Sequence, residues 1–375
     1  MRVIFLGLRG FPGVQGGVET HAEHLCPLLA DLGCEVTAIV RSPYMPPEKG
    51  ASWHGVRFVR VWSPKSKGME AIIHTFLGVL VAAWQRPDVL HIQAIGPALM
   101  TPLARLLGLK VVVTHHGPDY DRQKWGRFAR LVLRLGERWG MRLANERIVI
   151  SEVIREITQA KHGRTSVLIP NGVKLPELAV SDNIIRQFGL EPGKYVLLVS
   201  RLVPEKRHLD LVEAFRNANI PGWKLVLVGA ADHPDAYTQR VLETARGGQD
   251  IVCTGYQTGV ALSELYSHSG LFVLPSSHEG LPIAMLEALS YGRPVVASDI
   301  PANLEVGLPA ECYFKLGDVS ELAQKLCEFS ARSLTAKQVE QRRMWVVERY
   351  DWRHIGERTL AVYREVCGIG SGPGC

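Results

Sequence analysis

Short apolar runs alternate with longer amphipathic segments along most of the chain. Runs of Val, Ile and Leu predict strands that are buried on both faces, as in a parallel sheet. We expect these strands at 3–6, 35–40, 56–61, 89–92, 110–114, 147–150, 166–169, 195–199, 224–229, 271–274 and 295–297. Between them, apolar residues recur three and four positions apart, which is the period of an amphipathic helix. This alternation predicts an α/β protein with doubly wound, mostly parallel sheets.

One stretch, residues 276–299, shows this organisation most clearly. A polar turn follows a strand, and Pro282 then suits the first turn of a helix because its missing N–H would be unpaired there. Gly292 is the residue type favoured just past a helix end, and another strand follows it. The turn carries Glu279, and the helix carries Glu287.

The start of this helix suits a phosphate group, because it offers unpaired N–H groups and the positive end of the helix dipole. Glu279 and Glu287 would flank that site. Carboxylates repel phosphate and accept hydrogen bonds, so we assign them to the hydroxyl groups of a sugar ring and a ribose. The alternative is an exposed loop glutamate and a helix glutamate in a structural ion pair, and the spacing alone does not decide between the two.

The residues around this pair carry a specific resemblance. The segment EGLPIAMLEALSYGRPVVASD, which runs from Glu279 to Asp299, resembles the E-x7-E signature of the GT4-type retaining glycosyltransferases. The resemblance implies the GT-B fold, in which two Rossmann-like domains face a central cleft and a C-terminal helix crosses back to the first domain. It also implies transfer of a sugar from a nucleotide diphosphate sugar to an acceptor hydroxyl.

The same resemblance assigns donor-binding roles in the second half of the chain. Arg201 and Lys206, in SRLVPEK, match the basic pair that holds the donor diphosphate. Basic residues are unfavourable at the positive end of a helix unless an anion lies there, which supports this role over that of two merely exposed cations. Glu279 would bind hydroxyls of the transferred sugar, and Glu287 the ribose. Further donor contacts are expected from Gly229, Tyr256, Gly280, Leu281, Pro282 and Ile283.

The glycine-rich segment GLRGFPGVQGGVET follows the first strand, and a strand, Gly-rich loop and helix in series suggest a dinucleotide site. Two details argue against NAD or FAD: the glycines do not fall as G-x-G-x-x-G, and the second strand ends in Arg41 with no acid nearby for a ribose. The segment resembles the Gly-Gly-Val-Glu loop of GT4 enzymes. Gly16 and Gly17 would then lie at the interdomain cleft, near the donor phosphate or the acceptor.

The segment THHGPDYDRQKWG follows the strand that ends at 114, where ligands of such sheets bind. His116 matches the family histidine that contacts the transferred sugar. His115 is an alternative match, and a loop histidine with a purely structural role is the alternative to both. Asp119 and Asp121 imitate a D-x-D metal motif that belongs to the other main glycosyltransferase fold. We therefore expect no essential metal and no cofactor besides the donor substrate.

Arginines recur three or four positions apart at Arg127, Arg130, Arg134 and Arg138, beside an apolar stripe that begins at Phe128. Such a helix suits an anionic membrane surface that holds a lipid-linked acceptor. The alternative is that the apolar stripe packs on its own sheet and the arginines are solvated. The most apolar segment, 71–84, is too short to span a bilayer and is expected to be a buried helix.

The predicted domain boundaries follow from the resemblance and the turns. Asn171-Gly172 is a strong turn signal, and IPNGV resembles the passage between the two domains. We expect an acceptor-binding domain at 1–172, a nucleotide-sugar-binding domain at 173–350 and, after a cap at Asp351, a helix at 351–367 that packs on the first domain.

Composition and charge add the expected partners. The net charge is +6, and residues 1–175 hold 23 basic against 13 acidic residues. A basic first half suggests an anionic partner, and the absence of a nucleic-acid recognition motif favours a membrane surface over nucleic acid. Seven scattered cysteines and a first strand at residue 3 predict a cytoplasmic protein without a signal peptide. Contact with an anionic membrane would place it at the inner face of the plasma membrane.

Two other functions share this sequence pattern. A sugar-nucleotide epimerase of the same fold would need no acceptor. A non-catalytic scaffold of the same fold would not need Arg201, Lys206, Glu279 and Glu287 together.

Overall fold

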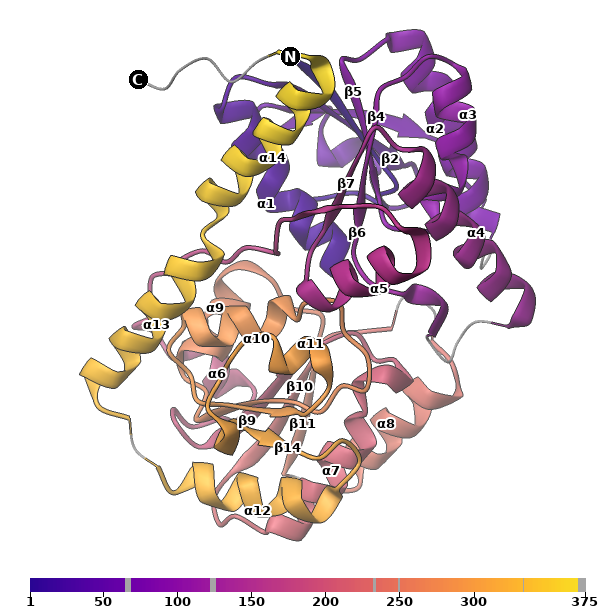
Figure 1. Ribbon diagram of the computed structural model, residues 1–375. Helices are drawn as coiled ribbons and strands as arrows, with labels where there is room; N and C mark the ends of the chain where they lie inside the picture. The colour runs from indigo at the N-terminus through magenta and orange to yellow at the C-terminus, as the bar shows by residue number, and fades with distance from the viewer. Residues whose placement is uncertain (65–68, 122–125, 232–233, 249, 333, 370–375) are drawn as a thin grey trace. The chain divides into compact units, whose positions relative to one another are not determined.

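The computed structural model describes residues 1–64, 69–121, 126–231, 234–248, 250–332 and 334–369. The chain divides into two compact units: unit 1 comprises Met1–Gly172 and Trp352–Cys375, and unit 2 comprises Val173–Asp351. Each unit is a sheet covered by helices, as Figure 1 shows. The predicted α/β fold with two Rossmann-like domains is confirmed.

Unit 1 is built on an eight-stranded sheet in the order β3-β4-β2-β1-β5-β6-β7-β8, parallel except for the β3–β4 pair. Its strands are β1 (Arg2–Leu6), β2 (Glu35–Arg41), β3 (Ser52–Trp53), β4 (Val56–Val61), β5 (Val89–Gln93), β6 (Val111–His115), β7 (Glu146–Val149) and β8 (Val167–Leu168). Its α-helices are α1 (Gly17–Asp31), α2 (Met69–Gln85), α3 (Thr101–Leu106), α4 (Arg127–Leu143), α5 (Glu152–His162) and α14 (Trp352–Cys367).

Unit 2 is built on a six-stranded parallel sheet in the order β11-β10-β9-β12-β13-β14. Its strands are β9 (Tyr195–Val199), β10 (Lys224–Val228), β11 (Ile251–Gly255), β12 (Leu271–Leu274), β13 (Val295–Ser298) and β14 (Tyr313–Phe314). Its α-helices are α6 (Asn183–Gln187), α7 (His208–Ala218), α8 (Ala236–Arg246), α9 (Gly259–Ser267), α10 (Ile283–Ser290), α11 (Pro301–Leu304), α12 (Val319–Ser330) and α13 (Ala336–Tyr350). Short 3-10 helices are η1 (Pro47–Lys49), η2 (Pro97–Met100), η3 (Asp119–Asp121), η4 (Pro204–Lys206) and η5 (Ala310–Cys312).

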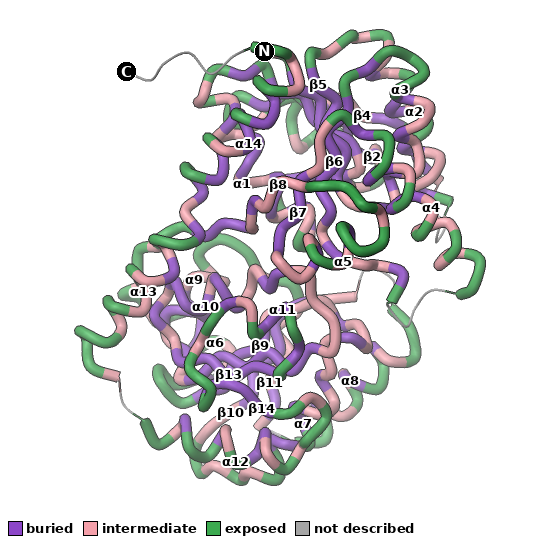
Figure 2. The backbone as a smooth tube through the Cα atoms, in the orientation of Figure 1, coloured by how far each residue is buried: buried purple, intermediate pink, exposed green. Residues whose placement is uncertain are grey.

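The alternation of side chains along each strand explains why both sheets are covered on two faces. In β1, Val3 and Phe5 belong to one apolar cluster of unit 1, whereas Ile4 and Leu6 belong to another. All four are almost fully buried. The tube in Figure 2 accordingly shows the strands of both sheets as the buried part of each unit.

Helix α14 packs within unit 1 against α1. A Cβ atom at Gly356 would lie 2.5 Å from the Leu28 side chain, so glycine permits this close approach. The buried Trp352 begins the helix, and the Tyr363 hydroxyl lies 2.6 Å from His91 Nδ1. The C-terminal helix therefore completes the core of unit 1 and does not belong to unit 2.

Three details differ from the sequence predictions. Helix α10 begins at Ile283, and Pro282 is its cap residue with an extended ψ of 93°. Strands β3, β11 and β14 were missed because two of them are two residues long and the third ends in Cys-Thr-Gly. Helix α2 is only partly buried, because one face of it exposes Phe76, Leu80 and Trp84.

Candidate functional site

The order of the strands in unit 2 reverses between β9 and β12. The chain runs from β9 outward to β11 and then returns to place β12 on the other side of β9. Loops that leave the carboxyl ends of two such strands part from each other and form the usual ligand site of an open α/β sheet. Arg201 and Lys206 lie in the loop after β9, and Glu279 lies in the loop after β12.

These two loops are joined by direct contacts. Lys206 Nζ donates a hydrogen bond to Glu279 Oε1, and the two side chains are 19% and 11% exposed. The backbone N–H of Ser277 donates to the carbonyl oxygen of Glu205 at 2.8 Å. Burial alone would raise the pKa of Glu279, but the charge and hydrogen bond of Lys206 outweigh it and lower that pKa. The site therefore holds a fixed ammonium and carboxylate pair.

A buried histidine supports the loop that carries Lys206. His208 opens α7 and lies with its Nε2 3.0 Å from the Ser200 hydroxyl, at the end of β9. Its backbone N–H donates to the Tyr237 hydroxyl of α8 at 3.0 Å. Burial, followed by the nearby charge of Lys206, lowers the pKa of His208 to about 3. This neutral imidazole joins β9, α7 and α8 at the base of the cationic loop.

Helix α10 supplies the rest of the predicted donor site. It begins after Pro282 without any side-chain cap, so its first N–H groups are those that an anion would bind. Met285, Leu286 and Leu289 are buried, which fixes the helix on its sheet. The partly exposed Glu287 accepts a hydrogen bond from the Tyr266 hydroxyl of α9 at 2.9 Å.

Two further predicted donor residues lie after β10 and β11. Gly229 has a φ of 136°, a conformation that favours glycine, and its N–H donates to the carbonyl oxygen of Gly255 at 2.8 Å. Tyr256 is the first residue after β11 and is 41% exposed. All predicted donor residues from Arg201 to Glu287 therefore lie in unit 2, in loops and helix starts at the carboxyl ends of its parallel strands.

The corresponding strand order of unit 1 reverses between β1 and β5. The glycine-rich loop follows β1 and is held by the ion pair of Arg9 with Glu19, in which Nε lies 3.0 Å from Oε1. Gly16 has a φ of 155°, and a Cβ atom there would lie 2.1 Å from Glu19 Oε2. Helix α1 begins at Gly17, again without a side-chain cap. Gly16 thus lies where the loop allows no side chain, and Gly17 is the first residue of a helix whose start has no side-chain cap.

The two candidate histidines have different surroundings. His115 is fully buried, with Nε2 3.0 Å from Glu137 Oε1 and Nδ1 accepting from the Gly117 N–H at 3.0 Å. Both ring nitrogens are therefore engaged within unit 1. His116 is only partly buried, and its Nε2 lies 2.7 Å from Gln93 Oε1 at the end of β5. Of these two histidines, only His116 has a ring nitrogen, Nδ1, without a hydrogen bond to another described residue.

His116 belongs to a set of uncharged histidines. Burial, followed by the influence of His91 and His115, lowers the pKa of His116 to about 3. Burial, followed by His21, lowers the pKa of His91 to about 3 as well. The rings of His21 and His116 meet edge to face with centroids 5.0 Å apart, and His21 Nδ1 lies 3.1 Å from Asn171 Oδ1. The histidine cluster of unit 1 is therefore polar and uncharged, whereas the glycine-rich loop beside it holds the Arg9–Glu19 ion pair.

The predicted basic stripe lies on α4. Arg127, Arg134 and Arg138 are exposed, Arg130 is partly buried, and the Arg134 guanidinium lies 5.5 Å from the centre of the Tyr120 ring. The face that packs on the sheet consists of Gly136, Glu137, Gly140 and Met141. Phe128 and Leu131 are 78% and 54% exposed, so the alternative that this apolar stripe packs on its own sheet is wrong for these two residues.

Asp119 and Asp121, which imitate a D-x-D motif, flank a tyrosine in the core of unit 1. Tyr120, between Asp119 and Asp121, is buried and donates to Glu137 Oε1 at 2.9 Å, and no group of three or more metal-ligating side chains gathers within the described ranges.

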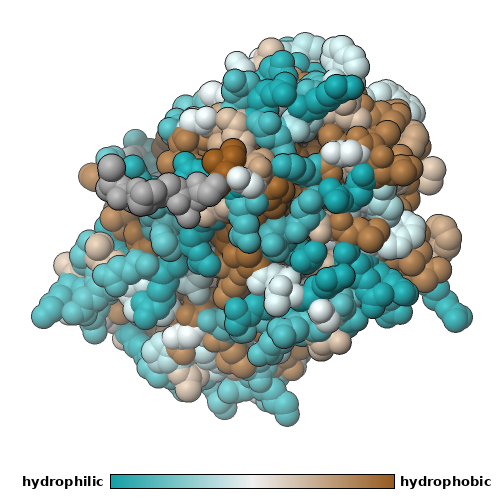
Figure 3. Space-filling view, turned by 45° about the horizontal axis from the view of Figure 1, so that its top comes forward, coloured by the Kyte–Doolittle hydropathy of each residue, from teal (hydrophilic) through white to brown (hydrophobic). Residues whose placement is uncertain are grey.

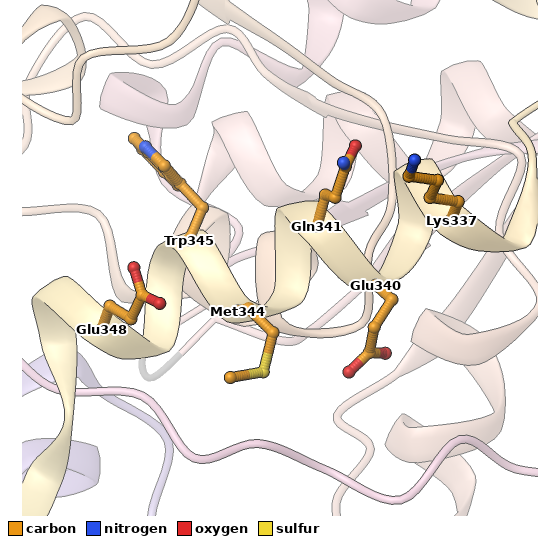
Figure 4. Close-up of a pocket in the computed structure, with 6 residues that line it drawn as sticks. All are labelled: Lys337, Glu340, Gln341, Met344, Trp345 and Glu348. Carbon is orange, nitrogen blue, oxygen red and sulfur yellow. The ribbon is translucent and has the colours of Figure 1, made fainter.

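A surface pocket, shown in Figure 4, is lined by side chains that all come from α13 and point away from that helix on different sides. They are Lys337, Glu340, Gln341, Met344, Trp345 and Glu348.

Four supporting residues were not predicted from the sequence: Gln93, Glu137, His208 and Tyr266. Each binds a partner at least eight positions away, so no local spacing indicates the pair. For Gln93 and His208, the sequence does offer one signal, which is a polar side chain at the edge of an apolar strand or helix start.

The fold and the two switch-point sites define the GT-B class of glycosyltransferases. The structure of Anabaena HepE in complex with UDP and glucose superposes with a TM-score of 0.78, over 97% of this chain and 100% of that one, at 19% sequence identity. A likeness at this identity shows a shared fold.

Family models and curated relatives identify the family. The model described as "Glycosyltransferase Family 4" matches residues 15–176, and "Glycosyl transferases group 1" matches residues 180–345. Alpha-D-kanosaminyltransferase of Streptomyces kanamyceticus is 25% identical over 74% of this chain and 76% of its own length. The UDP-Gal:alpha-D-GlcNAc-diphosphoundecaprenol alpha-1,3-galactosyltransferase of Escherichia coli is 28% identical over 58% of this chain and 59% of its own length. The chain belongs to the GT4-type glycosyltransferases of the GT-B fold.

Proposed function

We propose that this glycosyltransferase moves a sugar, with retention of configuration, from a nucleotide diphosphate sugar to an acceptor hydroxyl. The observation that supports this most is the Lys206–Glu279 pair at the switch point of unit 2. A nucleoside diphosphate gains negative charge as the sugar leaves it, and fixed cations stabilise that charge where it develops. The complex of Anabaena HepE with UDP and glucose supports a donor of this class.

Each part of the donor has a matching group in unit 2. Arg201 and Lys206 bind the diphosphate, together with the N–H groups of Gly280, Leu281 and Ile283 at the start of α10. Glu279 holds Lys206 in place and accepts hydrogen bonds from hydroxyls of the transferred sugar. Glu287, oriented by Tyr266, binds the ribose. In unit 1, His116 contacts the sugar, and Gly16 and Gly17 offer backbone N–H groups.

The proposed reaction takes place on one face of the sugar. The bond between the anomeric carbon and the departing phosphate oxygen breaks, and the acceptor oxygen forms its bond on the same face. The acceptor proton passes to the departing phosphate, so no protein nucleophile is needed. Lys206 and Arg201 would contribute most as that bond lengthens, because the phosphate charge is then largest. Since protein cations supply this stabilisation, we propose that turnover needs no divalent metal.

We further propose a lipid-linked or polysaccharide-precursor acceptor, used at the cytoplasmic face of the plasma membrane. The galactosyltransferase of Escherichia coli, whose name specifies a diphosphoundecaprenol acceptor, supports this class. The excess of basic residues in the first half of the chain also favours an anionic acceptor. No helix within the described part of the chain is long and apolar enough to cross a bilayer.

The surface that we propose to meet an anionic membrane combines α4 with α2. Helix α3 contacts both of them. The exposed arginines of α4 would bind lipid phosphates, and exposed apolar side chains beside them would enter the headgroup region. Figure 3 shows apolar surface on the side where Figure 1 draws α2 and α3. The apolar members include Phe76 (43% exposed), Leu80 (42%), Trp84 (84%) and Leu106 (84%).

A donor and acceptor screen tests the transferase proposal. The protein is incubated with UDP-, GDP- and dTDP-sugars in EDTA, with and without a polyprenyl-diphosphate sugar, and nucleoside diphosphate release is measured. We expect release from one donor that depends on the acceptor, and a product with the anomeric configuration of the donor. A changed sugar nucleotide without acceptor would favour an epimerase, and binding without turnover would favour a scaffold. Inversion of configuration would contradict the proposed mechanism.

Sedimentation with lipid vesicles tests the membrane proposal. We expect binding to vesicles that contain phosphatidylglycerol, weaker binding at higher salt, and loss of binding in the double variant Arg127→Glu, Arg134→Glu. Arg216→Glu in unit 2 is the matched charge control. Equal sedimentation of the double variant and the control would contradict the proposal.

A further inference from the structure

Within the described part of the chain, the side-chain amide of Gln93 is the hydrogen-bond partner of His116, the candidate sugar-contacting histidine. Gln93 ends β5, at the strand-order reversal of unit 1, and its side chain is fully buried. Its Oε1 lies 2.7 Å from His116 Nε2. An amide oxygen only accepts hydrogen bonds, so Nε2 of His116 must carry the hydrogen in this contact. A neutral imidazole with hydrogen on Nε2 has a lone pair on Nδ1.

We propose that Gln93 is a positioning residue that fixes His116 as the neutral Nε2–H tautomer and so presents Nδ1 as an acceptor for a substrate hydroxyl. This inference rests on the proposed function of His116 as a sugar contact. It goes beyond that function by assigning the direction of the hydrogen bond: the hydroxyl donates and the histidine accepts.

The other groups around His116 support a neutral ring. His21 of α1 faces the His116 ring, and Nδ1 of His21 donates to Asn171 Oδ1. His91 of β5 lies between the Tyr363 hydroxyl of α14 and the Thr114 hydroxyl. His115 binds Glu137, so that carboxylate is already engaged with the neighbouring histidine. Burial, followed by His91 and His115, lowers the pKa of His116, so a proton on Nδ1 is disfavoured near neutral pH.

A second atom of Gln93 points to the same conclusion. Its Nε2 is buried and has no hydrogen-bond partner among the residues that the structure describes. Leaving a buried donor unpaired is costly, and native proteins keep such groups mainly at functional sites or where water binds. Leucine or methionine would avoid this cost. The amide is retained at this position, in our interpretation, because its oxygen is required by His116.

Nitrogen NMR of histidine tests the tautomer directly and without turnover. The protein is labelled with ¹⁵N-histidine, and the His116 signals are assigned by comparison with His116→Gln. We expect Nε2 to show the shift of a protonated ring nitrogen and Nδ1 that of an unprotonated one, unchanged from pH 8 to pH 6. A protonated Nδ1 in the parent protein would overturn the proposal even if transferase activity is found.

Two variants add a kinetic readout that a purely structural role would not give. Gln93→Glu places a carboxylate against Nε2, which favours protonation of Nδ1. We expect kcat/KM of this variant to fall by about tenfold per pH unit below its new His116 pKa and to recover at high pH. Gln93→Met keeps the size and removes the acceptor, so we expect a pH-independent loss of about tenfold. Parallel pH profiles of Gln93→Glu and the parent would overturn the proposal, and Gln93→Met with unchanged kcat/KM and unchanged His116 shifts would do so as well.

If the proposed function is wrong, these experiments give a different set of results from those that would overturn the role of Gln93. If no donor and acceptor support turnover, the NMR measurement still decides whether Gln93 fixes the tautomer. If turnover is found but His116→Gln leaves it unchanged, His116 is not the sugar contact, and the tautomer has no role in catalysis.

Discussion

The two units carry candidate ligand sites at equivalent points of similar sheets, and the side chains that we propose to contact the ligand differ in charge. In unit 2, the loops at the β9–β12 reversal carry a charged pair, Lys206 with Glu279. In unit 1, the residues at and near the β1–β5 reversal include His91 and His116, and burial lowers the pKa of each to about 3. The same architecture therefore presents fixed charge in one unit and neutral hydrogen-bonding groups in the other.

The difference matches the two kinds of group that the proposed substrates present. A diphosphate needs cations and N–H groups, whereas sugar and acceptor hydroxyls need uncharged donors and acceptors at defined positions. Burial separates the two kinds of site, because it penalises an isolated charge and favours neutral imidazole. Glu279 stays ionised despite its burial because the charge and hydrogen bond of Lys206 lower its pKa.

Among these variants, removal of the Lys206 ammonium group should have the largest effect on catalysis. We expect Lys206→Ala to lower kcat by about 10²- to 10³-fold, the usual loss when one group that stabilises the leaving charge is removed. Steady-state kinetics with saturating donor measures it. Lys194→Ala, which removes an exposed lysine of the same unit that pairs with Glu191, is the control and should keep kcat. A loss confined to KM would show that Lys206 binds the ground state and transition state equally.

Acid should weaken unit 1 more steeply than unit 2. A histidine whose folded pKa is lowered binds fewer protons in the folded state than in the unfolded chain. The contribution of such a histidine to the free energy of unfolding therefore falls as pH drops below the ordinary histidine pKa of about 6.5. It falls by about 1.4 kcal/mol per pH unit until the pKa of the folded state is reached. Among the described residues, such shifts occur in unit 1 at His21, His74, His91, His116 and His162, and in unit 2 at His208.

Hydrogen exchange at pH 7 and pH 5, corrected for the intrinsic exchange rate, measures this difference. We expect the amides of β1, β5 and β6 to lose protection more than those of β9, β10 and β12. The variant His91→Phe should reduce the slope of unit 1, although loss of the Tyr363 contact will lower its stability at both pH values. Equal loss in the two units would mean that the buried histidines do not set the acid response.

Removal of the carboxylate of the Lys206–Glu279 pair should have a smaller effect, and the stability that this carboxylate contributes is also lost as pH falls. The pKa of Glu279 is lowered, so its contribution to stability is complete above the ordinary glutamate pKa of about 4.3 and is lost as pH falls through the folded value. We expect Glu279→Gln to lower the unfolding free energy of the protein at pH 7 by about 1–3 kcal/mol, because the mostly buried Lys206 loses its partner. Urea unfolding at pH 7 measures it, and an unchanged midpoint would contradict the pairing.

The smallest effect is expected at the ribose contact. Tyr266→Phe removes the hydroxyl that donates to Glu287 and leaves the ring, which stacks on Tyr291 with centroids 5.1 Å apart. We expect nucleotide binding to weaken by about three- to tenfold, the value of one hydrogen bond. Titration calorimetry measures it, with Glu287→Gln as the comparison that should lose at least as much. Unchanged affinity in both variants would remove Glu287 from the donor site.

The sequence predicted the parts of this molecule that depend on local patterns. Strands β4, β9 and β12 have the predicted bounds, because each is an apolar run flanked by polar residues. Ser151, the polar residue just before α5, caps that helix, and its hydroxyl accepts from the Ile154 N–H at 3.3 Å. Gly292 has the positive φ of 72° expected after α10.

The residues that the sequence did not indicate depend on pairs that form only in the fold. Gln93 bonds His116 across two strands, and His208 joins β9 to α8 through Tyr237. The buried face of α4 was also missed, because its glycines give little signal in an apolar pattern. Gly136 lies on that face because a Cβ atom there would come 2.1 Å from the Ile95 carbonyl oxygen. Apolar content alone could not show that Phe128 and Leu131 remain exposed.

The most direct test of the account is calorimetric titration of UDP, GDP and dTDP into the protein in EDTA. We expect one of these nucleotides to bind without metal, and its affinity to fall by about 100-fold in Lys206→Ala. The account would be contradicted if binding required a divalent metal, or if the best nucleotide bound the parent protein and Lys206→Ala equally well.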